Sequence, residues 1–389
     1  MNDLLVSVVP CESYAPETCE AALSAVLEPL GGLDWVRPGM RVGVKANLVT
    51  GANPDKAVTT HPALLAALTR LLISHGASVM IGDSPGNLFN TSVLNHVYAV
   101  SGLSEAERAG AELNRDCAEK EAFSSEAVQA KRFSYTAWLD GCDAIVNFCK
   151  LKSHGMMSLS AAAKNLFGTI PGTMKPEYHY RFPNPNDFAD MIVDLDEYFK
   201  PVLNVCDAVV AMEGNGPTQG KPKRVGALLA SKNPHALDVL AATLIGLEPK
   251  DVPTIAAAAR RNLAPDSVEA LSVAGDWKQF VQTDFELIEN RNSLLFVGGK
   301  NVFGKAIRGG MNLCLASLPK VKKRACIGCG RCRDVCPAHT ISIRNKKAVI
   351  DRKHCIKCFC CQEFCPVGAM RVHRSPVARI LTRGKERSK

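Results

Sequence analysis

Two cysteine motifs near the carboxyl end constrain this chain more than any other feature. Residues 326–337, CIGCGRCRDVCP, have the spacing Cys-x2-Cys-x2-Cys-x3-Cys-Pro, and residues 355–366, CIKCFCCQEFCP, repeat it. Nine of the 16 cysteines lie between Cys326 and Cys365. A secreted disulfide scaffold would be short and would follow a signal peptide, so these crowded cysteines are predicted to be metal ligands.

This spacing is typical of the two-cluster bacterial ferredoxins, which residues 324–372 resemble. In that pattern three thiolates on a short loop bind one 4Fe–4S cluster, and the fourth, beside a proline, binds the other. The spacing therefore predicts two 4Fe–4S clusters. The predicted ligands of the first cluster are Cys326, Cys329, Cys332 and Cys365. Those of the second are Cys355, Cys358, Cys361 and Cys336.

Zinc is the alternative occupant of such cysteines. Zinc sites use paired Cys-x2-Cys hooks rather than two triplets that are each followed by Cys-Pro, so the clusters are favoured. Cys360 is the ninth cysteine of the region, and its use would change the spacing to Cys-x-Cys. We therefore predict that Cys360 is not a ligand.

The positive charge of the chain is concentrated in the same region. Residues 320–389 hold 19 Lys+Arg against 4 Asp+Glu, whereas the rest of the chain holds 28 against 34. Cations beside an anionic cluster raise its reduction potential. A solvated surface is the simpler interpretation of these lysines and arginines. Residues 373–389 form a basic tail that predicts docking to an acidic electron donor or acceptor protein, or to the chain's own acidic body. An anionic membrane surface is a further alternative, and nucleic acid is disfavoured because no recognised motif is present.

The length of 389 residues predicts two or three domains. We expect an α/β body over 1–298, a basic Gly- and Lys-rich linker over 299–323, the ferredoxin module over 324–372, and the tail. The sequence contains no run of about 18 uncharged apolar residues, so a membrane-spanning helix is not expected. The first residues, MNDLLVSVVP, lack the features of a secretory signal, so a cytoplasmic location is expected.

The body has the pattern of an α/β protein. Apolar strands are predicted over 41–46, 78–82, 143–149, 205–212 and 225–231, with helices that begin after Pro62 and at Pro234. Strands separated by helices give parallel pairs. The predicted fold class is a mostly parallel sheet with flanking helices, plus a small C-terminal α+β domain of the two-cluster ferredoxin type.

Polar side chains follow four of these strands and are the candidate site. Ligands of parallel α/β sheets bind outside the carboxyl ends of the strands, so these residues are expected to converge, although such loops are polar by default. The candidates are Lys45 and Asn47 at the first strand, Asp83 at the second, Lys150, Lys152 and His154 at the third, and Glu213 and Asn215 at the fourth.

These segments resemble the family of iron–sulfur-centre proteins catalogued as domain of unknown function 362, over about residues 37–250. The segments that carry the resemblance are RPGMRVGVKANLV (37–49), TTHPALLAAL (59–68), GDSPG (82–86), KLKSHGMMSLSAAAKNLFGTIPG (150–172), DAVVAMEGNGPTQG (207–220) and NPHALDVLAA (233–242). Members of the family often carry a two-cluster ferredoxin module. The resemblance implies this architecture, and its name supplies no reaction.

Clustered lysines bind anions, so the site is predicted to take a carboxylate, phosphate or thioester. Residues 153–155 are expected to open a helix that adds anion affinity. On a straight helix Lys164 would lie roughly 15 Å beyond His154. Either that helix breaks, or Lys164 and Asn165 belong to a different wall of the site.

Residues 173–190 are rich in proline and aromatic residues, and we predict a long loop that could serve as a lid. Its candidate proton donors are Lys175, Tyr178, His179 and Tyr180. Glu213 could act as an acid, a base or a ligand to a cation. No dinucleotide-binding fingerprint is present, so a tightly bound nicotinamide is not supported, and a flavin stays open.

The leading hypothesis is an iron–sulfur oxidoreductase in which the clusters deliver single electrons to an anionic substrate in the body. In this hypothesis Lys150, Lys152, His154, His179 and Glu213 are catalytic, and Lys45, Asn47, Asp83, Lys164, Asn165 and Asn215 bind the substrate. The first alternative is a non-enzymatic electron carrier or adaptor that docks to a partner reductase. The second is a redox sensor or maturation factor.

Overall fold

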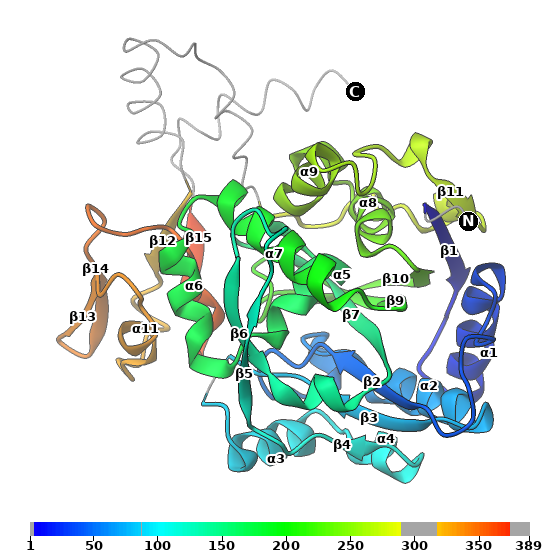
Figure 1. The fold of residues 1–389 in the computed structure, drawn as a ribbon. Coiled ribbons are helices and arrows are strands. Elements are labelled where there is room, and N and C mark those ends of the chain that lie inside the picture. The colour runs from blue at the N-terminus through cyan, green and yellow to red at the C-terminus, as the bar shows by residue number, and fades with distance from the viewer. Residues whose placement is uncertain (1–3, 87, 289–316, 374–389) are drawn as a thin grey trace. The chain divides into compact units, whose positions relative to one another are not determined.

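The computed structural model describes residues 4–86, 88–288 and 317–373, which form two compact units, Met1–Leu287 and Ile288–Lys389 (Figure 1). The first unit contains a nine-stranded sheet with the order β11-β1-β10-β9-β7-β2-β3-β4, and β8 pairs with β7. Its strands are β1 (Leu5–Pro10), β2 (Arg41–Ala46), β3 (Ser78–Gly82), β4 (Glu112–Leu113), β7 (Ala144–His154), β8 (Ser158–Ser160), β9 (Leu203–Glu213), β10 (Lys221–Ser231) and β11 (Ser272–Ala274).

The predicted fold class is confirmed by the strand directions. The pairs β4–β3, β3–β2, β2–β7 and β7–β9 are all parallel, and β1–β11 is parallel too. The pairs β9–β10 and β10–β1 are antiparallel, so the sheet is mixed but mostly parallel. The carboxyl ends of β2, β3, β7 and β9 therefore lie along one edge, where the sequence predicts the site.

Helices cover both faces of this sheet. On one face α1 (Pro16–Leu27) and α2 (Pro62–Ser74) bury leucines such as Leu23 and Leu68 (Figure 1). On the other, α8 (Pro234–Leu244) and α9 (Pro253–Arg260) bury Leu237 and Ile255. Neighbouring residues of β10 alternate between the two cores: Leu228 packs on the α1 side and Leu229 on the α8 side. This double burial explains why the central strands are almost continuously apolar.

The remaining secondary structure of the first unit lies in its connections. A separate hairpin pairs β5 (Glu119–Phe123) with β6 (Arg132–Thr136). The other helices are α3 (Thr91–Val100), α4 (Ser104–Arg108), α5 (Ala162–Asn165), α6 (Lys175–Arg181) and α7 (Pro185–Phe199). Two 3-10 turns, η4 (Leu166–Thr169) and η5 (Gly172–Met174), join α5 to α6.

Two predictions about local structure are wrong. Residues 153–155 do not open a helix, because β7 continues to His154 and turns back into β8, with Lys152 opposite Ser160. No straight helix therefore separates His154 from Lys164. Residues 173–190 are not a long loop either: they contain η5, α6 and the start of α7. Pro176 and Pro185, which suggested a loop, occupy the first turns of α6 and α7, where proline is well accepted.

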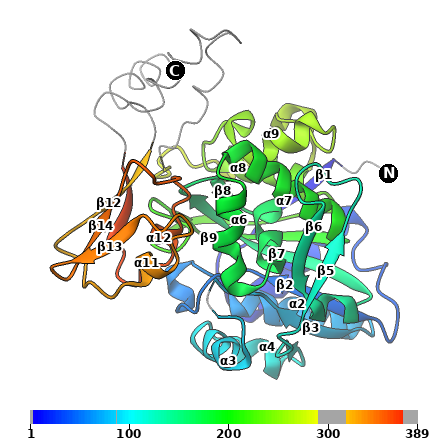
Figure 2. The same cartoon turned by 60° about the vertical axis from the view of Figure 1, so that its left-hand side comes forward.

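The described part of the second unit, residues 317–373, contains two strand pairs and two short helices (Figures 1 and 2). It pairs β12 (Leu318–Val321) with β15 (Met370–His373), and β13 (Ile341–Arg344) with β14 (Lys347–Ile350). The helices are α11 (Arg331–Asp334) and α12 (Cys360–Glu363). The predicted linker, residues 299–323, overlaps this unit, because residues 318–321 form β12, which pairs with the distant β15. Residues 299–316 of that linker, and 374–389 of the basic tail, lie outside the described residues.

Candidate functional site

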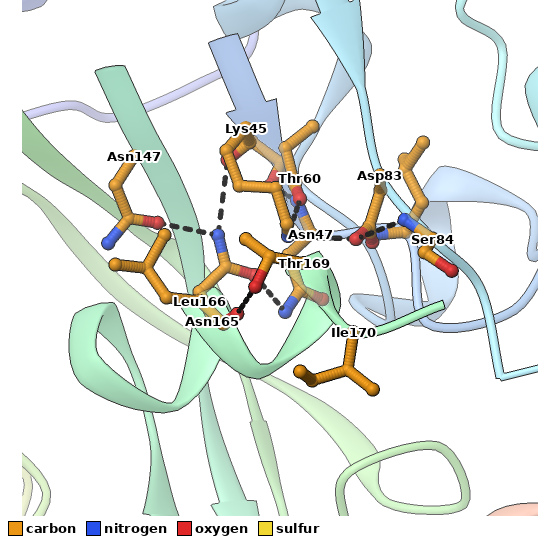
Figure 3. Close-up of polar contacts among 12 residues, drawn as sticks. Lys45, Asn47, Thr60, Asp83, Ser84, Asn147, Asn165, Leu166, Thr169 and Ile170 are labelled. Atoms are coloured by element: carbon orange, nitrogen blue, oxygen red, sulfur yellow. Dashed lines mark hydrogen bonds and ion pairs between the residues drawn. The ribbon is translucent and has the colours of Figure 1, made fainter. Parts of the chain in front are cut away.

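A buried ion pair lies at the carboxyl edge of the sheet, between the ends of β2 and β3 (Figure 3). Lys45 Nζ lies 2.8 Å from Asp83 Oδ1, and both side chains are buried. The lysine also donates to Ala46 O, while the carboxylate accepts the backbone N–H groups of Leu48 and Ser84 at 2.6 and 2.8 Å. The charge of Lys45 is thus offset within the protein.

An amide network joins this pair to α5 and β7 (Figure 3). Asn165 donates to Lys45 O at 3.1 Å and to Asn147 Oδ1 at 2.8 Å, and it accepts from Asn47 at 2.9 Å. Lys152 Nζ donates to Asn47 Oδ1 at 2.8 Å and to Val58 O at 2.9 Å. Five predicted residues therefore meet in one buried network: Lys45, Asn47, Asp83, Lys152 and Asn165.

The turn η4 passes directly over the ion pair. A Cβ atom on Gly168 would lie 2.4 Å from Asp83 Oδ1 and 2.6 Å from Lys45 Nζ, closer than any real contact allows. Gly168 O also accepts the N–H of Ser84. Only glycine fits here, because the backbone itself closes the site from above.

A second buried ion pair contains Lys150, two residues before Lys152 on β7. Lys150 Nζ lies 2.7 Å from Asp207 Oδ2 and donates to Tyr14 Oη at 2.9 Å, and Tyr14 donates to Asp207 Oδ1 at 3.0 Å. The ring of His61 stacks on the ring of Tyr14 with a centroid distance of 3.5 Å. The backbone N–H of His61 donates to Asp207 Oδ2.

Burial shifts the titration of both aromatic residues of this second cluster. It raises the pKa of Tyr14 well above its usual range, and nearby Asp207 raises it further, so Tyr14 holds its proton. Burial also lowers the pKa of His61 to about 4, so its imidazole is neutral at pH 7. Tyr14, His61 and Asp207 were not among the residues predicted from the sequence. His61 and Asp207 lie inside the family segments at 59–68 and 207–220, which was the available signal.

Lys175 is a further cation of this region, and its side chain donates to neutral oxygens. From the start of α6 its half-buried side chain reaches inward, and Nζ donates to Ile170 O at 2.6 Å, to Ser84 O at 2.7 Å and to Ser84 Oγ at 3.3 Å. No carboxylate of the described residues forms an ion pair with it. Burial lowers the pKa of Lys175 to about 7. The charge of Asp83 opposes this shift, and the charges of Lys45 and Lys164 add to it.

The other predicted residues have different surroundings. His154 is buried, and Nδ1 accepts the N–H groups of Met156 and Met157 in the turn between β7 and β8. Lys164 Nζ lies 4.4 Å above the ring of Phe167, and His179 stacks on Phe188 at 4.3 Å. Glu213 Oε2 accepts the N–H of Glu286 at 2.9 Å, and Asn215 lies in the loop that follows β9.

The cysteines of the second unit surround two hollows of similar empty volume, about 320 and 310 Å³. We call the first of these the outer hollow, which is lined by Cys326, Cys329, Cys332 and Cys365 among other residues. We call the other the inner hollow, lined by Cys336, Cys355, Cys358, Cys360 and Cys361 among others. Each hollow thus receives its cysteines from both sequence motifs.

The surroundings of the sulfur atoms fit an anionic cluster. Backbone N–H groups point at three of them: Ala369 at Cys365 Sγ (3.1 Å), Ala348 at Cys326 Sγ (3.4 Å) and Thr340 at Cys336 Sγ (3.4 Å). Such donors stabilise the thiolate ligands of iron–sulfur clusters. One 4Fe–4S cluster needs four thiolates, and the outer hollow is lined by four cysteines and the inner hollow by five.

An α/β body combined with a cysteine-lined ferredoxin unit defines an iron–sulfur protein. The pattern of the 4Fe-4S dicluster domain matches residues 318–366, and the domain of unknown function DUF362 matches residues 42–243. The chain belongs to the DUF362 family.

The chain is also similar to two individual proteins. The chain is 33% identical over 292 residues to the thylakoid-associated protein sll1697 of Synechocystis sp.. The matched region covers 73% of this chain and 88% of the relative. The lactate racemase apoprotein from Thermoanaerobacterium thermosaccharolyticum is 12% identical with a TM-score of 0.39, over 61% of this chain and 56% of that chain.

The sequence also predicts a cytoplasmic location and no membrane-spanning helix. Within residues 4–86, 88–288 and 317–373, no helix is long and apolar enough to cross a membrane. The cytoplasmic location stays a prediction.

Proposed function

We propose that this protein is an iron–sulfur oxidoreductase that reduces a small anionic substrate at the carboxyl edge of its parallel strands. The observation that carries the proposal is the presence, in one chain, of two cysteine-lined hollows and a buried lysine-rich network at the edge where α/β sheets bind ligands. When bound, two 4Fe–4S clusters supply single electrons. The body supplies the substrate site and the proton.

The proposed ligands follow the crossed pattern of the sequence. In the outer hollow they are Cys326, Cys329, Cys332 and Cys365, and in the inner hollow Cys355, Cys358, Cys361 and Cys336. The lining of the two hollows supports this assignment. Cys360 also lines the inner hollow, and we keep it outside the ligand set because its use would break the Cys-x2-Cys spacing.

The ion pairs refine the roles of the lysines. Asp83 and Asp207 offset the charges of Lys45 and Lys150, so we assign these two lysines to holding the shape of the site. Contact with the anionic group of the substrate is assigned to Lys152 and Lys175. The neutral partners of Lys175 favour this role, because a carboxylate or phosphate competes better with carbonyl oxygens than with an aspartate.

Lys175 is also the favoured proton donor. A group with a pKa of about 7 is half protonated at neutral pH and can give its proton to a reduced substrate. The structure favours Lys175 over the other candidates because His154 accepts backbone N–H groups in a turn, His179 stacks on Phe188, and Glu213 accepts a backbone N–H. A flavin in the body stays a candidate cofactor, which the absorbance spectrum after cluster removal would reveal.

A reoxidation assay decides between an enzyme and an electron carrier. The protein is purified without oxygen, its clusters are reduced chemically, and their visible absorbance is followed after addition of cell extract separated into small-molecule and protein fractions. The proposal predicts rapid reoxidation by the small-molecule fraction. Reoxidation by the protein fraction alone would contradict it and would favour the carrier. The name of the Synechocystis relative adds a membrane surface to the locations worth testing.

A further inference from the structure

The two hollows of the second unit differ in their access to solvent. Four lining residues of the outer hollow are exposed: Ile327, Cys329, Pro366 and Val367. Ile327 is 61% exposed and Val367 is 42% exposed, which is high for branched apolar side chains. Every described residue that lines the inner hollow is buried or half-buried, including Phe359 at 3% and Cys360 at 1%. Electrons from another protein therefore have a shorter path to the outer hollow.

Positive charge surrounds this exposed group. Arg331 follows the outer hollow's Gly330 and is exposed, and the backbone of Lys346 lies against Gly328, where an added Cβ would be 2.5 Å from Lys346 O. Lys347 Nζ donates to Cys326 O at 2.6 Å. An apolar centre with a cationic rim is thus present beside one cluster position.

The charge of the whole described unit has the same sign. Residues 317–373 hold 13 Lys+Arg and 3 Asp+Glu. Two of the three acids are already paired, Asp334 with Arg333 and Asp351 with His354. Such a surface attracts acidic proteins and repels basic ones.

We infer that the face formed by Ile327, Cys329, Pro366 and Val367, with its rim of Arg331, Lys346 and Lys347, docks an acidic one-electron carrier protein. This inference rests on the proposed function and names its electron donor. One electron passes from the reduced carrier to the oxidised cluster of the outer hollow, and no bond or proton changes. Small interfaces of this composition suit transient electron transfer, in which the carrier must leave quickly.

Stopped-flow kinetics with a reduced, acidic plant-type ferredoxin as the probe test the inference. For the wild type we expect a second-order rate that falls steeply as salt is added. Ile327→Asp and Arg331→Glu should each lower this rate at low salt by about tenfold, because they remove the apolar centre or reverse a rim charge. Matched controls are Val349→Asp, at a 40% exposed residue of β14, and Arg352→Glu, at an exposed cation; neither residue lines a hollow.

The outcomes separate the inference from the proposed function. Equal rates in Ile327→Asp and Val349→Asp, both with full iron content, would overturn the docking face and leave the proposed function intact. An unchanged rate in Ile327→Asp with a lowered melting temperature of the body would assign this face to the chain's own body and also overturn the inference. A wild type that holds its iron but cannot be reduced even chemically would instead contradict the proposed function.

Discussion

At the scale of single residues, the buried lysines differ in what offsets their charge. Lys45 and Lys150 each meet an aspartate in the interior, whereas Lys175 meets three neutral oxygens. The sequence pointed to Lys45 and Lys150, because each ends or follows a predicted apolar strand, and to Lys175 as a candidate proton donor within residues 173–190. It did not show that Lys150 pairs with Asp207, since that pairing depends on the register between β7 and β9. These differences lead to two predictions.

Breaking the Lys45–Asp83 pair should destabilise the protein strongly. Lys45→Met leaves a buried carboxylate without its cation, and we expect the free energy of unfolding to fall by about 3–5 kcal/mol. The matched control is Lys120→Met, which breaks the exposed pair with Asp140 and should cost at most about 1 kcal/mol. Urea unfolding monitored by circular dichroism measures both. Equal losses in the two variants would contradict the account.

The lowered pKa of Lys175 can be measured without a substrate. The neutral amine reacts with acetic anhydride, so the labelling of Lys175 should rise with pH and level off above its pKa of about 7. A solvated lysine in a model peptide has a pKa of about 10.4, and as the control it should still gain reactivity well above neutral pH. Quantitative mass spectrometry of the peptides follows both. A labelling midpoint for Lys175 that matches the control would show that burial does not favour its neutral form.

At the scale of elements, the five predicted strands are present as β2, β3, β7, β9 and β10, whereas β1, β4, β8, β11 and the helices between β8 and α7 were not predicted. Residues 41–46 and 78–82 form strands with the predicted ends, because short apolar runs bounded by polar residues leave few alternatives. Residues 153–155 suggested the start of a helix, yet β7 continues to His154, since pairing with β8 and β9 overrides local preference. The prolines at 176 and 185 suggested a loop although each opens a helix. The site was therefore predictable where strands end and not where η4 and α6 close it.

Gly168 tests this closing segment directly. Gly168→Ala should displace the Lys45–Asp83 pair, because its Cβ would overlap both charged groups, and we expect a loss of about 1–3 kcal/mol in the free energy of unfolding. Gly141→Ala is the matched control, since a Cβ there meets nothing within 4 Å. Thermal unfolding of both variants gives the comparison. If Gly168→Ala were as stable as Gly141→Ala, η4 would not lie over the ion pair.

At the scale of the whole molecule, the chain divides into a body with its own two-sided core and a small unit built around cysteines. The crossed cysteine pattern was predictable because cluster chemistry restricts spacing severely. The start of this unit was not, because β12 is recognisable only by its pairing with β15 near the other end of the unit. The electron-carrier and sensor alternatives differ from the proposed enzyme in whether electrons pass from the clusters to a substrate in the body. Redox experiments test this difference.

Removal of iron should affect the two units unequally. The energy of ligand binding is part of the folding energy of a small metal-dependent unit, so loss of the clusters should unfold residues 317–373. The body buries its own apolar cores and should keep its structure. Hydrogen exchange measured by mass spectrometry, before and after chelation of the iron under oxidising conditions, follows both units. Equal loss of protection in peptides from 42–243 would show that the body depends on the clusters.

The central claim is that electrons from the clusters reach a substrate that Lys175 binds and protonates in the body. Its most direct test is the rate of cluster reoxidation by the active small-molecule fraction, measured in Lys175→Met and in the exposed control Lys250→Met, with iron content confirmed in both. The account predicts a loss of roughly 100-fold or more in Lys175→Met, the usual contribution of a general acid, and a wild-type rate in the control. A wild-type rate in Lys175→Met would contradict it.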